Sequence, residues 1–255
     1  MKLLEGKKGL VFGVANQFSI AWAIAQAARE HGAEVAIGVQ NERMKESAQR
    51  LFENQEPYPT VIADLNDDAQ IESMREELRE RLGGLDFTVH SVAYALREEL
   101  AGRFLDTSRE GFRIALETSA YSFLAMTKGL EELLHDNASL LTMTYLGSQR
   151  VIPFYNVMGV AKAALEAITR HLAYEMGGRG IRVNAISPGP ISTVSARGIK
   201  GFAQMQPVLV EKAPLKRPAE QKEVASTAVY LMSDLSRGVT GQVIYVDSGY
   251  HFMGL

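Results

Sequence analysis

The feature that most constrains this chain is the regular alternation of short apolar runs with longer segments of helical periodicity. Apolar runs of about four to eight residues, bounded by glycine or polar residues, are typical of buried strands. The predicted strands are Gly9–Val14, Glu34–Val39, Thr60–Ala63, Leu85–His90, Ala138–Thr144, Ile181–Ile186 and a last one within Thr240–Gly249. Strands that alternate with helices form parallel sheets, so we predict an α/β fold in which ligands bind at the carboxyl ends of the strands.

Size and charge narrow the choice further. A chain of 255 residues can form one large domain that buries about three quarters of its unfolded surface, and no linker interrupts this chain. We therefore predict a single domain, residues 1–255, with a doubly wound sheet of seven strands in the order 3-2-1-4-5-6-7 and helices on both faces. The net charge of −3 argues against a nucleic-acid partner, which would require a basic surface.

Residue usage excludes several kinds of chemistry. The chain has no cysteine, which excludes disulfides, thiolate metal sites and cysteine nucleophiles. Its five histidines are scattered without the spacing of a metal motif, so we expect no metal site. No apolar run is long enough to span a membrane, and the first residues lack the apolar core of a signal peptide. We expect a cytoplasmic protein with no membrane partner.

The segment Tyr155 to Lys162 carries the strongest sign of chemistry. In a helix, residues seven apart lie about 20° short of two full turns, so Tyr155 and Lys162 share a face. A second tyrosine, Tyr145, follows the predicted strand Ala138–Thr144. Two phenols and one ammonium would make a site able to hold an oxyanion beside a ribose. Chance placement of these residues near a helix start is the alternative.

The first strand leads into a loop and a helix that begins near Ser19. Ser19 is a good N-cap for an alanine-rich helix, and Gly32 a good C-cap. Such a helix start favours a pyrophosphate, as in Rossmann-like folds. The Gly-x-Gly-x-x-Gly fingerprint is nevertheless absent, because Gly13 is the only glycine in the turn. An ordinary strand-to-helix connection therefore stays open.

Together these segments resemble the short-chain dehydrogenase/reductase superfamily, whose usual signature is Tyr-x3-Lys with an upstream serine. Here Gly159 stands four residues after Tyr155, and the lysine comes at x6. Tyr-x6-Lys with a second tyrosine upstream resembles the divergent branch that contains the bacterial enoyl-acyl carrier protein reductases. The resemblance extends over nearly the whole chain.

The resemblance implies a nicotinamide dinucleotide cofactor. Gln40 stands where these enzymes select the cofactor, but glutamine alone decides little, and Arg43 and Lys45 follow closely. Similarity to enzymes with glutamine at this position favours NADH and leaves NADPH possible. The implied cofactor-binding residues are Gly13, Ser19, Ile20, Gln40, Asp64, Leu65, Ser91, Val92, Ala93, Lys162, Ile191 and Thr193. His90, by contrast, is expected to be a satisfied strand histidine.

The implied substrate pocket involves four segments of the chain. Its predicted residues are Ala95, Tyr145, Tyr155, Met158, Ala196, Ile199, Phe202 and Met205. The last four recur every third residue within 194–207, which predicts a short amphipathic helix that closes over an acyl chain as a lid. Ordinary core packing explains the same apolar stripe.

The reaction that the resemblance implies is NADH-dependent reduction of a trans-2-enoyl thioester on acyl carrier protein, in fatty-acid elongation. The implied catalytic residues are Tyr155 as donor to the thioester oxygen, Lys162, and Tyr145 as pocket wall and second donor. Two alternatives remain: a 3-ketoacyl or carbonyl reductase, and a dinucleotide-binding protein without catalysis. The long helix predicted from Thr107 or Ser108 to about His135 is expected to pair with the Tyr155 helix in a homotetramer.

Overall fold

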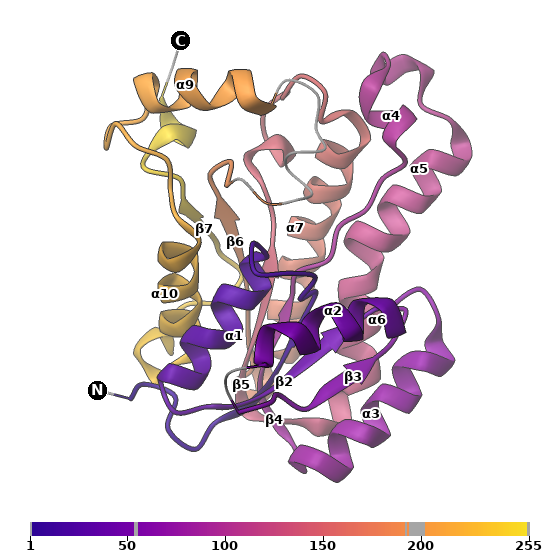
Figure 1. The fold of residues 1–255 in the computed structure, drawn as a ribbon, viewed down its shortest axis with the longest axis vertical. Helices are drawn as coiled ribbons and strands as arrows, with labels where there is room; N and C mark the ends of the chain where they lie inside the picture. The colour runs from indigo at the N-terminus through magenta and orange to yellow at the C-terminus, as the bar shows by residue number, and fades with distance from the viewer. Residues whose placement is uncertain (1, 54–55, 192, 194–201, 254–255) are drawn as a thin grey trace.

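Seven parallel strands form one sheet in the order β3-β2-β1-β4-β5-β6-β7, which confirms the predicted topology (Figure 1). The computed structural model describes residues 2–53, 56–191, 193 and 202–253, with the backbone alone for 202–206. The strands are β1 (Lys8–Phe12), β2 (Glu34–Val39), β3 (Thr60–Ile62), β4 (Leu85–His90), β5 (Leu134–Met143), β6 (Arg182–Pro188) and β7 (Val243–Val246). Because all seven run the same way, their carboxyl ends lie at one edge of the sheet.

Helices cover both faces of the sheet, as Figure 1 shows. One face carries α1 (Ile20–Glu30), α2 (Glu42–Gln49) and α10 (Gln221–Met232), whose buried side chains form one apolar cluster with the sheet. The other face carries α3 (Asp68–Leu82), α6 (Ser122–Leu130) and α7 (Asn156–Met176), which form a second cluster. The short helix α4 (Arg97–Ala101) and α9 (Phe202–Lys212) lie toward the carboxyl edge.

The remaining helical segments are short. They are η1 (Arg50–Phe52), η2 (Phe104–Asp106), α5 (Arg109–Leu116), η3 (Glu117–Tyr121), η4 (Glu131–Leu133), η5 (Leu146–Ser148), η6 (Gly177–Arg179), η7 (Asp234–Ser236) and η8 (Tyr250–Phe252). The predicted long helix from Ser108 is thus divided into α5, a π-helical turn and α6. Ser108 caps it as predicted, because its hydroxyl accepts a hydrogen bond from the Gly111 backbone N–H.

The start of α1 differs from the prediction in one respect. Ser19 is the N-cap residue, but its hydroxyl makes no cap hydrogen bond to the helix. It accepts hydrogen bonds from the N–H groups of Ala15 and Asn16 instead, and donates one to the Asn16 carbonyl. The side chain therefore orders the loop after β1 and leaves the first N–H groups of α1 without a side-chain cap. At the other end the C-cap is His31, and Gly32 follows it with φ +94°.

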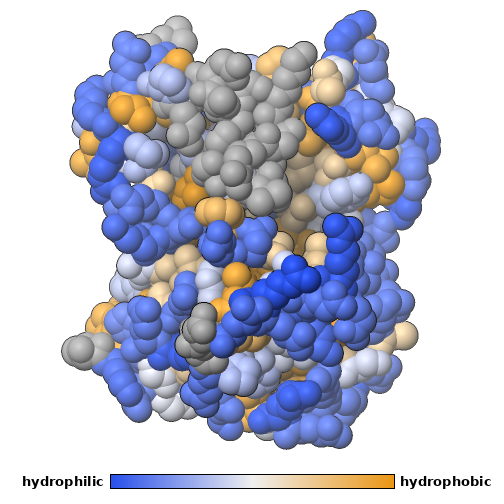
Figure 2. Space-filling view, in the orientation of Figure 1, coloured by the Kyte–Doolittle hydropathy of each residue, from blue (hydrophilic) through white to orange (hydrophobic). Residues whose placement is uncertain are grey.

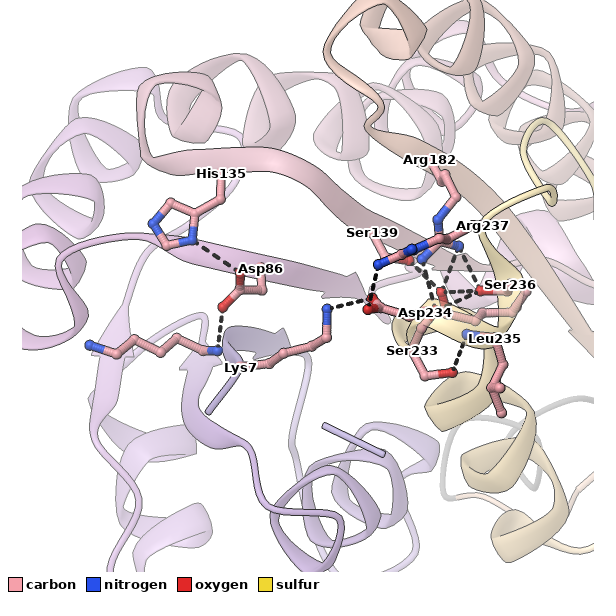
Figure 3. Close-up of polar contacts among 12 residues, drawn as sticks. Lys7, Asp86, His135, Ser139, Arg182, Ser233, Asp234, Leu235, Ser236 and Arg237 are labelled. Atoms are coloured by element: carbon pink, nitrogen blue, oxygen red, sulfur yellow. Dashed lines mark hydrogen bonds and ion pairs between the residues drawn. The ribbon is translucent and has the colours of Figure 1, made fainter. Parts of the chain in front are cut away.

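At the amino-terminal edge of the sheet, polar side chains satisfy one another (Figure 3). The buried Arg182 guanidinium donates to the carbonyls of Leu231 and Ser233 and to the Ser236 hydroxyl, at 2.8, 3.3 and 2.8 Å. Ser139 donates to the same Leu231 carbonyl. This network joins the end of α10 to the middle of β5 and the start of β6, away from the edge where a ligand is expected.

Among the helices in the described part of the chain, none is both long enough and apolar enough to cross a bilayer. The longest, α7, carries Lys162 and Glu166 near its middle, and both side chains are buried against the protein. Its apolar residues therefore serve the core of the domain.

Candidate active site

The fold gathers the predicted site residues at the carboxyl edge of the sheet. Gly13 follows β1, Gln40 follows β2, Asp64 and Leu65 follow β3, Ser91 to Ala95 follow β4, Tyr145 follows β5, and Ile191 and Thr193 follow β6. Residues from six separate segments thus lie at one end of the domain. In Figure 2, apolar side chains show in the hollow between the upper and lower halves of this face, and the rim around it is hydrophilic.

The two tyrosines form the centre of the site. The rings of Tyr145 and Tyr155 lie edge to face, with centroids 5.0 Å apart. Tyr155 is 9% exposed, so its phenol is not turned toward solvent. Burial raises the pKa of Tyr155 well above its usual range and that of Tyr145 to about 12. Both phenols therefore keep their protons at neutral pH and can donate hydrogen bonds.

Two glycines make room for this tyrosine pair. A Cβ on Gly147 would lie 2.5 Å from the Tyr155 ring, and a Cβ on Gly159 would lie 2.7 Å from the Gly147 carbonyl oxygen. Gly159 occupies the position of the usual Tyr-x3-Lys lysine. The helix thus packs against η5 at the position where a lysine would stand, and Lys162 comes three residues later on α7.

The ammonium of Lys162 lies inside the protein beside the end of β5. Its Nζ donates a 2.8 Å hydrogen bond to the Met143 carbonyl, and the residue is 4% exposed. Burial lowers the pKa of Lys162 to about 8, and the charge of Glu166 opposes this shift. The lysine is therefore mostly charged at pH 7 and titrates just above it.

The loops after β1 and β4 form a close backbone cradle. Gly13 has φ +108°, and a Cβ there would lie 2.3 Å from the Ser91 carbonyl oxygen, so no larger residue fits. Ser91 in turn donates its N–H to the Phe12 carbonyl. The uncapped start of α1 lies at the same edge, which is the arrangement that binds pyrophosphates in dinucleotide-binding folds.

The ends of β2 and β3 meet through a side-chain hydrogen bond. The Gln40 amide donates to the Asp64 carboxylate at 3.1 Å, which joins two residues that the sequence assigned separately to the cofactor. Leu65 is buried in the second apolar cluster. Arg43 is exposed, and Lys45 pairs with Glu42 of its own helix at 3.8 Å. A carboxylate, rather than a cation, is thus fixed at this end of the site.

A dinucleotide also fits the end of β6. The Ser187 hydroxyl is buried and has no hydrogen-bond partner among the residues that the structure describes. Ile191 and Thr193, just beyond, are half-buried, and Ile191 packs against the first apolar cluster. A buried hydroxyl left without a partner costs free energy unless a ligand or water meets it. The Ser187 hydroxyl could bond to a dinucleotide that also lies against the backbone at Gly13.

The substrate side is described in part. Met158 is buried, and its sulfur lies 3.7 Å from the Ser119 hydroxyl, which also bonds both backbone groups of Tyr94. Ser119 therefore connects Met158 with the segment that carries Ala95. Ala196 and Ile199 lie outside the described residues, as do the side chains of Phe202 and Met205. The described helix α9 begins at Phe202, within the predicted lid range of 194–207.

His90 is fully buried and bonded on both ring nitrogens, as expected for a satisfied strand histidine. Its Nδ1 lies 3.1 Å from the Thr142 hydroxyl and its Nε2 2.8 Å from the Ser122 hydroxyl. Burial lowers the pKa of His90 to about 3, with a further contribution from the charge of Lys162. A neutral imidazole therefore lies beneath the site. Within the described residues, no group of three or more metal-ligating side chains occurs.

Several residues at the site had no sequence signal of their own. Asn156 donates to the Gly102 carbonyl at 2.9 Å and ties the start of α7 to α4, in a backbone with φ +34°. Glu166 accepts hydrogen bonds from Thr144 and Ser148. A positive φ for asparagine is the one local propensity that points here, and the contacts of Glu166 depend on packing between segments far apart in the chain.

Fold and site together define a dinucleotide-binding α/β oxidoreductase with a Tyr-x6-Lys centre. A model of the enoyl-(acyl carrier protein) reductase family matches residues 13–251. The chain belongs to the enoyl-acyl carrier protein reductase family. This confirms the family resemblance and the reductase activity that the sequence indicated.

Relatives agree over the full length. An enoyl-acyl-carrier-protein reductase (NADH) of Rhizobium meliloti is 47% identical over 99% of this chain and 93% of its own. The crystal structure of the Bacillus cereus enoyl-acyl carrier protein reductase with NADP+ and indole naphthyridinone superposes with a TM-score of 0.95, at 44% identity and with both chains fully covered. The Anaplasma phagocytophilum enzyme, in complex with NAD, gives a TM-score of 0.95 at 43% identity, covering 99% of this chain and 97% of that one.

Proposed function

We propose that this enzyme reduces the 2,3 double bond of a trans-2-enoyl thioester on acyl carrier protein, with Tyr155 as the donor to the thioester oxygen. Bound NADH supplies the hydride that the β-carbon accepts. As that carbon is reduced, negative charge moves onto the thioester oxygen. A neutral, buried phenol already present at that point stabilises the charge as it develops, because its hydrogen bond strengthens in the transition state.

The observation that carries this proposal is the placement of the Tyr155 phenol, which is buried at the carboxyl edge of the sheet against the Tyr145 ring. A ketone reductase needs its tyrosine to give up a proton to the product alkoxide, which a lowered pKa would favour. An enolate needs only a hydrogen-bond donor until its α-carbon takes a proton. A buried phenol that keeps its proton is therefore suited to hold the enolate of an enoyl thioester.

Lys162 and Tyr145 have supporting roles in this proposal. The Lys162 ammonium would hold the nicotinamide ribose, and its charge would favour the developing anion. Tyr145 packs edge to face on Tyr155 and so fixes the ring that donates the hydrogen bond. Met158 and Ala95 would contact the acyl chain from the side of the β4 loop.

We propose NADH as the preferred cofactor because Asp64 is bonded to Gln40 where a 2′-phosphate would be read. A fixed carboxylate accepts hydrogen bonds from ribose or adenine and repels a phosphate. In an Asp64→Asn variant we expect the ratio of NADPH to NADH affinity to rise about tenfold, the scale of one charge interaction of about 1.4 kcal/mol. An unchanged ratio in fluorescence titrations would remove Asp64 from cofactor choice.

The experiment that tests the reaction is a nicotinamide absorbance assay with crotonyl and acetoacetyl thioesters of acyl carrier protein. We expect NADH oxidation with the crotonyl thioester and little with the acetoacetyl thioester. The reverse preference would make the protein a ketoacyl reductase. Binding of NADH with no oxidation by either substrate would make it a dinucleotide-binding protein without catalysis.

We further propose a cytoplasmic homotetramer whose subunits meet through α5 and α7. An apolar groove with exposed aromatic rings lies between these helices. Its lining residues are Arg109, Phe112, Arg113, Leu116, Glu117, Ala120, Tyr121, Ala164 and Ile168. Phe112→Glu should convert the tetramer to smaller species in light scattering, whereas Tyr174→Glu, an exposed site elsewhere on α7, should not.

We also propose residues 194–207 as the lid that covers the acyl chain.

A further inference from the structure

We propose that Glu166 is a positioning residue of this active site: its one buried carboxylate holds the Tyr145 segment through Thr144 and Ser148 and sustains the positive charge of Lys162. The inference rests on the proposed function, since it concerns how the Tyr145, Tyr155 and Lys162 groups are held. It assigns no contact between Glu166 and the substrate. Glu166 acts through its neighbours.

The position of Glu166 is unusual for an acidic residue. It lies on α7 one helical turn after Lys162 and is 5% exposed. Acidic side chains are almost never so buried unless they are paired. A buried carboxylate therefore has a partner that compensates for the loss of water.

Two hydroxyls supply part of that compensation. Thr144 Oγ1 donates to Glu166 Oε1 at 2.7 Å, and Ser148 Oγ donates to the same oxygen at 2.5 Å. Thr144 immediately precedes Tyr145, and Ser148 ends η5 just after it. The carboxylate thus anchors both ends of the short segment that carries Tyr145 and Gly147, and Gly147 is the residue against which Tyr155 packs.

The positive charge of Lys162 also offsets the cost of burying the Glu166 carboxylate. Among the residues that the structure describes, the Lys162 ammonium has one hydrogen bond, to the neutral Met143 carbonyl, and burial lowers its pKa. Glu166 is the group whose charge raises it again. Glu166 lies one helical turn from Lys162 on α7, and a nearby opposite charge favours the charged form of a buried base.

Other titratable groups around the pair do not replace this interaction. His90 of β4 is neutral and feels the lysine charge. Tyr145 and Tyr155 keep their protons. On β7, burial raises the pKa of Tyr245, the charges of Glu166 and Asp247 raise it further, and the charge of Arg150 lowers it. Asp247 is engaged by the N–H groups of Gly249 and His251 and by the His251 ring. Among these groups, Glu166 is the one whose charge raises the pKa of Lys162.

A neutral isostere separates the two parts of the proposal. Glu166→Gln keeps an oxygen that can accept from Thr144 and Ser148 but removes the charge, so the Lys162 pKa should fall. Ser148→Ala keeps the charge and removes one anchor of the Tyr145 segment. Glu166→Asp is the conservative variant that restores the charge.

The first readout is the titration of Lys162 in the protein without cofactor, followed by NMR of labelled lysine and assigned by its loss in Lys162→Met. We expect the midpoint to move to lower pH in Glu166→Gln and to stay near the wild-type value in Ser148→Ala. For a shift of about one pH unit, the protonated fraction at pH 8 falls from about one half to about one tenth. An unmoved midpoint in Glu166→Gln would overturn the proposal.

The second readout is the split between NADH binding and turnover. Glu166→Gln should weaken NADH binding about fivefold at pH 8 and little at pH 6, following the protonated fraction of Lys162. Ser148→Ala should lower kcat and leave NADH affinity unchanged.

If Glu166→Gln does not fold, the effect of the Glu166 charge is tested by Glu166→Asp. The midpoint of the Lys162 titration in this variant should stay within about half a pH unit of wild type. A larger fall there would contradict it. The Lys162 titration needs no substrate, so it decides this proposal even if the enoyl reaction is absent.

Discussion

The two edges of the sheet bury polar side chains equally well but satisfy them differently. At the amino-terminal edge, Arg182 meets two carbonyls and a hydroxyl, and Ser139 meets one of the same carbonyls (Figure 3). At the carboxyl edge, the Lys162 ammonium meets one carbonyl, and the Ser187 hydroxyl has no partner within the described part of the chain. Polar groups that the protein satisfies stabilise the fold, whereas those it leaves incomplete are available to a ligand.

Burial shifts pKa values at both edges: it lowers the pKa of Arg182 at the amino-terminal edge, and the larger shifts lie at the carboxyl edge. At the carboxyl edge burial dominates: it lowers the pKa of Lys162 and raises those of Tyr145 and Tyr155. Each charged form is disfavoured because no sufficient partner lies nearby. Such perturbed groups are concentrated where catalysis is expected. The comparison predicts that substitutions at one edge change stability and substitutions at the other change function.

The largest expected effect is on stability, at Arg182. In Arg182→Met the three hydrogen bonds from the guanidinium to the Leu231 and Ser233 carbonyls and the Ser236 hydroxyl are lost, although Ser139 and Ser236 still donate to the Leu231 carbonyl. Loss of these buried hydrogen bonds from a charged group should lower the free energy of unfolding by about 3 kcal/mol. Thermal and urea denaturation measure this loss, and kcat of the folded variant should equal that of wild type. A loss of kcat without a loss of stability would contradict the division between the edges.

The next effect is on cofactor binding, at Lys162. Lys162→Met removes a charged donor, so NADH affinity at pH 7 should fall about tenfold, the scale of one charge-assisted hydrogen bond. The wild-type affinity should be full below pH 8 and decline as pH rises through the Lys162 pKa of about 8. The Met variant should lack this decline. Isothermal titration across pH gives both quantities, with Lys128→Met, an exposed lysine on α6, as the matched control.

The same lysine predicts how stability depends on pH. Its pKa is lower in the folded protein than the usual 10.5, so the unfolded chain binds its proton more tightly. The destabilising contribution of Lys162 is therefore complete below pH 8 and disappears as pH rises from about 8 to 10.5. Compared with Lys162→Met, the wild type should gain relative stability over that range. A constant difference would contradict the shifted pKa.

The smallest effect is expected at Lys7, on the rim of the Arg182 network. Lys7 pairs with Asp234 at 3.0 Å, but the Asp234 side chain is 60% exposed (Figure 3). Exposed ion pairs contribute about 0 to 1 kcal/mol, and salt screens them. Lys7→Ala should therefore cost less than 1 kcal/mol in urea denaturation, and less still at high salt. A cost equal to that of Arg182→Met would mean that burial does not explain the strength of this network.

Much of the fold could be predicted from the sequence because period and length are local signals. The predicted bounds of β2 and β4 agree with the structure, and α3 ends at Gly83, with φ +77°, as is common for a glycine after a helix. The strand β5 begins four residues earlier than predicted. Its first part, Leu134 to Asn137, has three polar residues after Leu134 and joins the sheet through an irregular register beside β4. Hydrophobic periodicity does not detect such a segment.

The site was less predictable than the fold. Tyr145, Tyr155 and Lys162 could be named because the spacing of a tyrosine and lysine on one helix is a local property. Ser19 was assigned a helix-capping role, yet its hydroxyl bonds to the preceding loop, because an N-cap pattern does not specify which N–H groups the side chain meets. The contacts of Glu166 with Thr144 and Ser148 join residues that lie 22 and 18 positions apart in the chain. No spacing rule connects them.

The most direct test of the account is kcat of Tyr155→Phe with crotonyl-acyl carrier protein at saturating NADH. Loss of one donor to a developing oxyanion should lower kcat by about 100-fold, and NADH affinity and stability should match those of wild type. A kcat within about twofold of wild type would show that the buried phenol at residue 155 does not stabilise the charge that forms on the thioester oxygen.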